Sequence, residues 1–152
     1  MSVTVRDNGF KKRMAQLKKP AHVTVGVHAD DGAKVEGGGV TVAEVAAIHE
    51  FGLGVPERSW LRDFVTDNDA KLKVMLREIG RRVASGADSE REMERFGLVV
   101  VGMIKERIVA GISPELAPET LLQKIRVTGA PKETPLIRFG QFISSIAHRV
   151  NE

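Results

Sequence analysis

The stretch LRDFVTDNDAKLKVMLREIGRRVASGADSEREMERFGLVVVGMIKERIVAG, residues 61–111, decides the fold. Its first half carries apolar side chains at helical spacing up to Gly86, namely Leu61, Phe64, Leu72, Met75 or Leu76, Ile79 and Val83. In the second half, Ser89 followed by Glu92 matches a capping box and predicts a helix that runs towards Gly111. The β-branched run 98–101 would also suit a strand, but the cap and the charged flanks favour a helix. Two adjacent helices of this length are typical of an antiparallel hairpin packed on a sheet.

On the N-terminal side of this hairpin the sequence predicts a helix, a strand and a second helix. Phe10, Met14 and Leu17 fall on one face of a short helix over residues 8–18, with Asn8 as its N-cap and Pro20 after its end. Residues 22–28 alternate, with valines on one face, as in a half-buried strand. Residues 41–51 return to helical spacing. Thr41 and Glu44 form a capping box there, and Gly52 is a helix stop.

On the C-terminal side, residues 112–135 form a Pro-rich connection around a short predicted helix at residues 119–126, and residues 143–150 alternate as a last strand. The whole chain, residues 1–152, is therefore expected to form a single α+β domain. A small antiparallel sheet packs against the helical hairpin in this prediction. Residues 29–40 are Gly-rich and acidic, which predicts a flexible loop.

The composition limits the classes of function. The chain has no cysteine, which excludes disulfides and thiolate metal sites. Its longest apolar run, residues 96–104, is far shorter than the roughly 20 residues of a membrane span, so no membrane association is expected. Residues 1–20 carry six Lys/Arg and one Asp, whereas residues 21–68 carry three Lys/Arg and eight Asp/Glu. A chain polarised in this way suits contacts between oppositely charged patches of neighbouring copies, although a basic segment can also bind phosphates.

Signs of catalysis or of cofactor binding are weak. His49-Glu50 begins like a zinc-protease motif, but the second histidine that this motif needs four positions after the first is replaced by Leu53. His22 and His28 share a strand face, and His148 on the other strand could complete a metal site, although half-exposed sheet histidines are the commoner case. The acids Glu50, Glu57, Asp63 and Asp67 suit a solvated helix face better than a catalytic pair. We expect no enzyme activity, no cofactor and no metal.

Two stretches are more informative. Residues 46–52 read AAIHEFG and lead through a Gly/Pro turn into residues 56–62, PERSWLR. Residues 135–146 read PLIRFGQFISSI. Together they resemble the tail-completion and virion-morphogenesis proteins of long-tailed bacteriophages, in order and in spacing, over about residues 21–75 and 114–150. Ser59-Trp60 stands where that family has Pro-Phe, and Arg138-Phe139 stands where it has Asp-Thr.

The resemblance implies a structural subunit of the virion. Such proteins form a ring, commonly a hexamer, that joins the tail to the connector around the DNA channel, as a tail-completion, tail-terminator or neck protein. The implied partners are further copies of this chain and other neck and tail-tube proteins. DNA would pass through the ring without sequence-specific binding. Assembly would take place in the host cytoplasm, and the finished location would be the head–tail junction. The alternatives are a small basic DNA-binding protein and a hydrolase.

The candidate interface residues come from the polarised charge, the Gly-rich loop and the first of the two stretches. Trp60, with Phe51, Leu61 and Phe64, could form an internal cluster, contact a neighbouring subunit, or do both. The candidates for contacts with a neighbouring subunit or within the ring are Lys18, Lys19, Asp30, Asp31, Gly37, Gly38, Gly39, Glu50, Phe51, Gly52, Arg58, Trp60 and Arg62.

Overall fold

The structure, a computed structural model, describes residues 9–17, 21–28, 39–114, 122 and 140–151. Its elements are α1 (Phe10–Leu17), β1 (His22–Val27), α2 (Val42–Phe51), α3 (Arg62–Ala84), α4 (Ser89–Ala110), α6 (Gln141–Ser145) and β2 (Ile146–Asn151). The predicted α+β class, with a small antiparallel sheet packed against a helical hairpin, is confirmed. The predictions for Asn8, for residues 29–38 and for the Pro-rich connection after residue 114 lie outside the described residues, except for Leu122.

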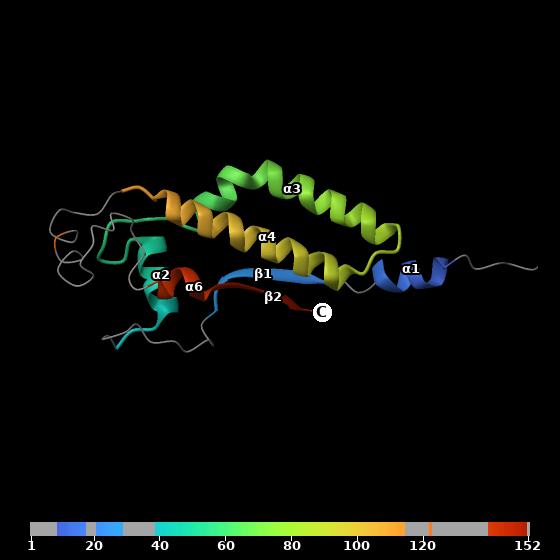
Figure 1. The fold of residues 1–152 in the computed structure, drawn as a ribbon, viewed down its shortest axis with the longest axis horizontal. Helices are drawn as coiled ribbons and strands as arrows, with labels where there is room; N and C mark the ends of the chain where they lie inside the picture. Colours follow the sequence, from blue (N-terminus) through green and yellow to red (C-terminus); the bar gives the residue numbers. More distant parts are fainter. Residues whose placement is uncertain (1–8, 18–20, 29–38, 115–121, 123–139, 152) are drawn as a thin grey trace, which may run out of the picture.

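The described elements form three layers. The helices α3 and α4 make an antiparallel hairpin, and α4 lies between α3 and the two strands (Figure 1). Strand β1 pairs with β2 in antiparallel register, with His22 opposite Asn151 and Val27 opposite Ile146. The two strands come from opposite ends of the chain. The sheet therefore ties the N-terminal and C-terminal segments to the same helix.

The core follows the apolar stripes of the hairpin. The most completely buried side chains are Phe64 on α3, Ile104 and Ile108 on α4, and Ile146 at the start of β2. Burial of a side chain of this size stabilises the fold by about 1.5–3 kcal/mol. Helix α4 contributes residues to the contacts with α3 and to those with the sheet, which explains why its buried stripe is the broader one. The other core residues are Val42, Ala46, Trp60, Ile79, Val83, Phe96, Val100, Val101, Ile112 and Phe142.

Ion pairs join the two helices of the hairpin near each of its ends. Near the turn, the buried Glu92 carboxylate accepts from Nε of Arg82 at 2.8 Å and lies 3.3 Å from Nη1 of Arg95. Near the other end, Nη1 of Arg107 donates to Asp67 at 2.6 Å. The predicted capping box of Ser89 and Glu92 is wrong. Asp88 caps α4 by accepting from the Arg91 N–H at 2.8 Å, and Glu92 turns to the arginine of α3 instead.

A glycine on α4 lies against β2. A Cβ atom on Gly97 would lie 2.5 Å from the nearest ring atom of His148. The ring of His148 fills this space, and its Nε2 lies 2.9 Å from Oε1 of Glu94, one turn back on α4. The glycine therefore sets the distance between the helix and the sheet.

The last strand begins later than its alternation predicts. Residues 141–145 form the short helix α6, and β2 starts at Ile146. The hydroxyls of Ser144 and Ser145 donate to the carbonyls of Gln141 and Phe142, both at 2.8 Å, so that they stabilise a helical turn. In the part of the chain that the structure describes, no helix has both the length and the apolar character needed to cross a bilayer.

Candidate functional site

The turn between α2 and α3 is organised by one buried carboxylate. Glu50 lies in the last turn of α2 and is only 7% exposed. Its Oε2 accepts from the Leu61 N–H at 3.0 Å, and its Oε1 accepts from the Arg62 N–H at 3.0 Å and from the Ser59 hydroxyl at 2.9 Å. Leu61, the N-cap residue of α3, provides no side-chain hydrogen bond. Glu50 therefore caps α3 from another helix and places a negative charge at the positive end of the helix dipole.

Gly52 allows the chain to turn back across α2. It adopts the left-handed conformation at φ 66°, and its N–H donates to the carbonyl of Ile48. A Cβ atom at this position would lie 3.0 Å from Cβ of Glu57, so a larger residue would meet both backbone strain and a clash. The turn then returns to α2, where the Arg58 N–H donates to the His49 carbonyl at 2.8 Å.

The side chain of Arg58 ties the turn to the end of α4. Its Nε donates to the Pro114 carbonyl at 2.8 Å, and the residue is buried. Burial lowers the pKa of the Arg58 guanidinium below its usual value because the charged form loses hydration. The guanidinium stays protonated at any physiological pH.

Trp60 links residues 46–62 with the C-terminal helix α6. Its Nε1 donates to the Ala46 carbonyl at 3.2 Å, so its polar group is satisfied inside the chain. Its ring meets the ring of Phe142 edge to face, with centroids 5.2 Å apart and an interplanar angle of 89°. Phe142 belongs to α6, in the second stretch. Residues more than 80 positions apart in the chain thus pack on each other, in the favoured aromatic geometry.

The outer rim of the turn is exposed. The guanidinium of Arg62 lies 5.8 Å from the ring centroid of Phe51, which is 59% exposed. Nη2 of Arg62 donates to the Glu50 carbonyl at 3.2 Å and also pairs with the carboxylate of Glu57. The rim thus combines an exposed aromatic ring with a fixed cation, a combination that is enriched in protein–protein contacts.

A shallow groove of about 350 Å³ lies between β1 and α2. Its walls are mainly apolar, and α2 contributes three small residues, Ala43, Ala46 and Ala47. Phe51 and Glu50 also line it, which makes the groove continuous with the turn. Its remaining lining comes from Thr24, Val25, Gly26, Val27, His28, Trp60 and Leu61.

The carboxylate of Glu50 is fully used inside the chain. Both oxygens of Glu50 already accept hydrogen bonds from the chain, which leaves this carboxylate poorly placed to accept a proton from a substrate. The described residues contain no group of three or more His, Asp or Glu side chains that could hold a metal ion.

The histidine site that the sequence allowed is not formed. His148 lies opposite Val25 in the register and faces α4, whereas the face that His22 shares with Thr24 is the other one. Directly opposed residues of an antiparallel pair share a face, so His148 is separated from His22 by the sheet. His28 lies beyond the end of β1, with Nε2 3.2 Å from the Thr24 hydroxyl.

The structure brings together six of the predicted interface residues and separates them into two groups. Glu50, Arg58 and Trp60 are buried and make contacts within the chain, whereas Phe51, Gly52 and Arg62 reach the surface of the same turn. Gly39 is exposed just before α2. Lys18, Lys19, Asp30, Asp31, Gly37 and Gly38 lie outside the described residues, and contacts of any of these residues with another subunit remain a prediction.

Two contributors to this site were not predicted. No capping role was predicted for Ser59. Its hydroxyl accepts from the Asp63 N–H at 3.1 Å and donates to Glu50. A serine shortly before an apolar helical stripe is a capping signal, and it could have been recognised as one. The alanine wall of the groove follows from the contact between α2 and β1, and no local pattern indicates it.

Comparison of the chain with protein-family models, with curated proteins and with solved structures gives no match in any of the three.

Proposed function

We propose that this chain is a structural subunit of a tailed bacteriophage or prophage. It acts at the head–tail junction, as a tail-completion, tail-terminator or neck protein, in a homo-oligomeric ring around the DNA channel. The observation that carries the proposal is the contact between Trp60 and Phe142. The described part of the second stretch, residues 140–146, thus packs on the first, as expected if both belong to one architecture rather than being two chance matches.

The chemistry of the turn supports an assembly role. Its polar residues hold α2, α3 and the segment that follows α4 together, through Glu50, Ser59 and Arg58. Phe51 and Leu53, on either side of Gly52, are both exposed. Exposed apolar side chains beside a rigid, internally bonded turn suit a surface that another protein covers.

The function follows from repeated contacts. In a ring each subunit makes the same interface with two neighbours, and the interfaces reinforce one another because the second contact is made at high effective concentration. No cofactor and no turnover are needed. The DNA in the channel is passed without reading its sequence, since contacts with the phosphate backbone depend on charge alone.

The proposal is tested by deleting the gene in a phage or lysogen whose genome encodes the chain. We expect filled heads and separate tails, which plaque-forming units and negative-stain imaging would reveal. Joining should be restored by the wild-type chain. It should also be restored by a chain with Glu94→Gln, because that side chain is 54% exposed and a glutamine can still hydrogen-bond to His148. Normal, infectious particles in the absence of the gene would refute the proposal.

A further inference from the structure

We propose that α1 of one copy of this chain docks in the groove between β1 and α2 of a neighbouring copy. The inference rests on the proposed function, because it names the contact by which the subunits of the ring would recognise each other. It is carried by two complementary surfaces that a single chain presents at opposite ends.

The first surface is the exposed apolar face of α1. Phe10 and Met14 lie four positions apart, on adjacent turns of this helix, and are 66% and 38% exposed. Helix α1 has only eight residues and would be too short to be stable in water alone. It contacts α3 of its own chain, and this contact leaves Phe10 and Met14 exposed. A short helix with its aromatic and thioether side chains on one exposed face is the form of ligand that apolar grooves accept.

The second surface is the groove itself. Its volume of about 350 Å³ corresponds to roughly a dozen water molecules, on a share of ~30 Å³ each, and exceeds what one methyl or isopropyl group would fill. Ala43 and Ala47 lie one turn apart along its α2 wall. Their small side chains let another helix approach closely, and the spacing of these alanines matches the spacing of Phe10 and Met14.

The charges of the two surfaces are opposite. Helix α1 carries Lys11, Lys12 and Arg13 and no acidic residue. The segment that bears the groove, residues 39–63, carries four acids and two arginines. The Glu50 carboxylate lines the groove but is bonded to the start of α3, and Glu57 pairs with Arg62. The exposed Glu44 and Asp63 therefore account for the negative excess of this segment. The attraction favours this pairing over the contact of two identical ends.

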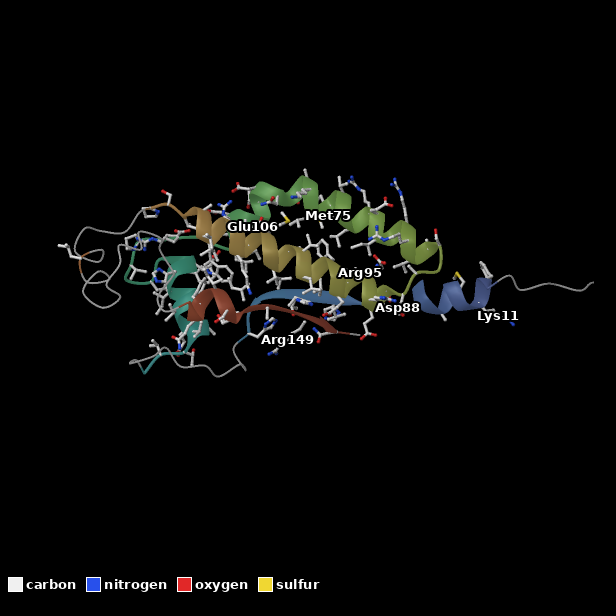
Figure 2. The ribbon with its side chains drawn as sticks, viewed as in Figure 1. Lys11, Met75, Asp88, Arg95, Glu106 and Arg149 are labelled. Carbon is white, nitrogen blue, oxygen red and sulfur yellow. The ribbon has the colours of Figure 1, made fainter. Side chains whose placement is uncertain are left out.

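The positions of the surfaces determine the type of assembly. Helix α1 lies beyond the turn of the α3–α4 hairpin, whereas α2 lies at the other end of the molecule (Figure 1). Figure 2 shows Lys11 at this outer end, past Asp88 at the hairpin turn. Because donor and acceptor surfaces are different, the contact is heterologous and joins copies head to tail. Repetition of such a contact gives a ring when its rotation closes.

The absence of cysteine from the chain makes disulfide trapping a clean test. One set of chains carries Phe10→Cys or Met14→Cys, and a second set carries Ala43→Cys or Ala47→Cys. Each donor is mixed with each acceptor at equal concentration, oxidised, and followed as a dimer band on a non-reducing gel. Val74→Cys, at an exposed apolar position on α3, replaces the acceptor as the matched control for random collision. Disulfides need Cβ atoms about 3.5–4.5 Å apart, so the four pairings sample neighbouring registers.

We expect at least one of the four pairings to form the dimer more than tenfold faster than the donor–Val74→Cys control. Raising the salt from 50 mM to 500 mM should slow that pairing towards the control rate, because the charge attraction is screened. If all four pairings react at the control rate, the docking is refuted. The docking is also refuted if adding Phe10→Asp to the Met14→Cys donor leaves the rate of dimer formation unchanged.

The outcome separates this inference from the proposed function. A ring found in virions whose subunits do not trap through these positions would refute the docking and leave the phage assignment intact. Rapid trapping of a protein that is absent from virions would support the docking and refute the phage assignment. Capture of α1 by another neck protein, with no self-trapping, would also refute the docking.

Discussion

Glu50 illustrates how much one side chain determines at the scale of single residues. From the sequence it was a candidate for an interface, or for a catalytic base in the hydrolase alternative. In the folded chain its carboxylate accepts from two backbone N–H groups and one hydroxyl at the start of α3. This role depends on a contact between two helices that are separated by the turn at Gly52, and no local pattern in the sequence contains that contact.

Replacement of Glu50 by alanine should destabilise the chain by about 3 kcal/mol, because the loss of a buried, hydrogen-bonded charge leaves its donors unsatisfied. Urea unfolding followed by circular dichroism measures this. The matched control is Glu57→Ala, which removes the exposed carboxylate that pairs with Arg62. This change should cost no more than about 1 kcal/mol. A loss below about 1 kcal/mol for Glu50→Ala would show that Glu50 does not hold the turn.

Gly97 and Gly102 form a second matched pair of residues, both inside α4. At Gly97 an added Cβ would lie 2.5 Å from the His148 ring, whereas at Gly102 nothing lies within 4 Å. Gly97→Ala should therefore destabilise the chain by about 1–3 kcal/mol through overpacking. Gly102→Ala should stabilise it by up to about 1 kcal/mol through helix propensity. Thermal unfolding of both variants is the measurement. Equal effects would mean that α4 does not approach β2 at Gly97.

At the scale of elements, the local signals were the reliable ones. The Thr41–Glu44 capping box and the Gly52 stop of α2 were predicted and are both confirmed, because each depends on residues within one helix and its ends. Sequence patterns gave wrong predictions for Glu92 and for residues 143–145. Glu92 was assigned to a cap, but Arg82 on the preceding helix attracts it. The alternation from Ile143 indicated a strand, but serine hydroxyls stabilise a helical turn before it.

The capping box of α2 predicts a pH dependence. The Thr41 backbone N–H, and after it the Thr41 hydroxyl, hold the pKa of Glu44 below its usual 4.5. Because the folded-state pKa is depressed, the stabilisation is complete above the unfolded-state value and is lost as the pH falls through the folded-state value. Glu44→Gln should lower the urea midpoint at pH 7, and the midpoints of the two proteins should converge as the pH drops below 4.5. Parallel midpoints across this range would contradict the assignment.

At the scale of the whole molecule, the order of the described elements followed from the sequence except for α6, but the groove did not. The groove requires α2 to lie beside β1, and no periodicity in the sequence encodes the distance between these two elements. The sequence also does not encode that α1 and α2 lie at opposite ends of the molecule (Figure 1). Sequence could predict that the two ends differ in charge. It could not predict that one end carries an exposed apolar helix face and the other an apolar groove.

The polarised charge leads to a prediction that separates the ring from a DNA-binding module. We expect only weak, salt-labile binding to duplex DNA, because the acidic residues 21–68 oppose the basic residues 1–20. A fluorescence titration across a salt series measures this. A DNA-binding protein that neutralises about six phosphates should lose affinity with a log–log slope near −5. Sequence-selective binding in the nanomolar range at physiological salt would favour the DNA-binding alternative.

The proposed position of the chain at the head–tail junction is tested most directly by imaging the neck of the particles whose genome encodes it. Electron cryomicroscopy of that region should resolve a closed ring of copies of this chain between connector and tail tube. The α3–α4 hairpin and the two-stranded sheet should be recognisable in each copy. A location in the capsid shell, or the absence of the protein from purified particles, would contradict the account.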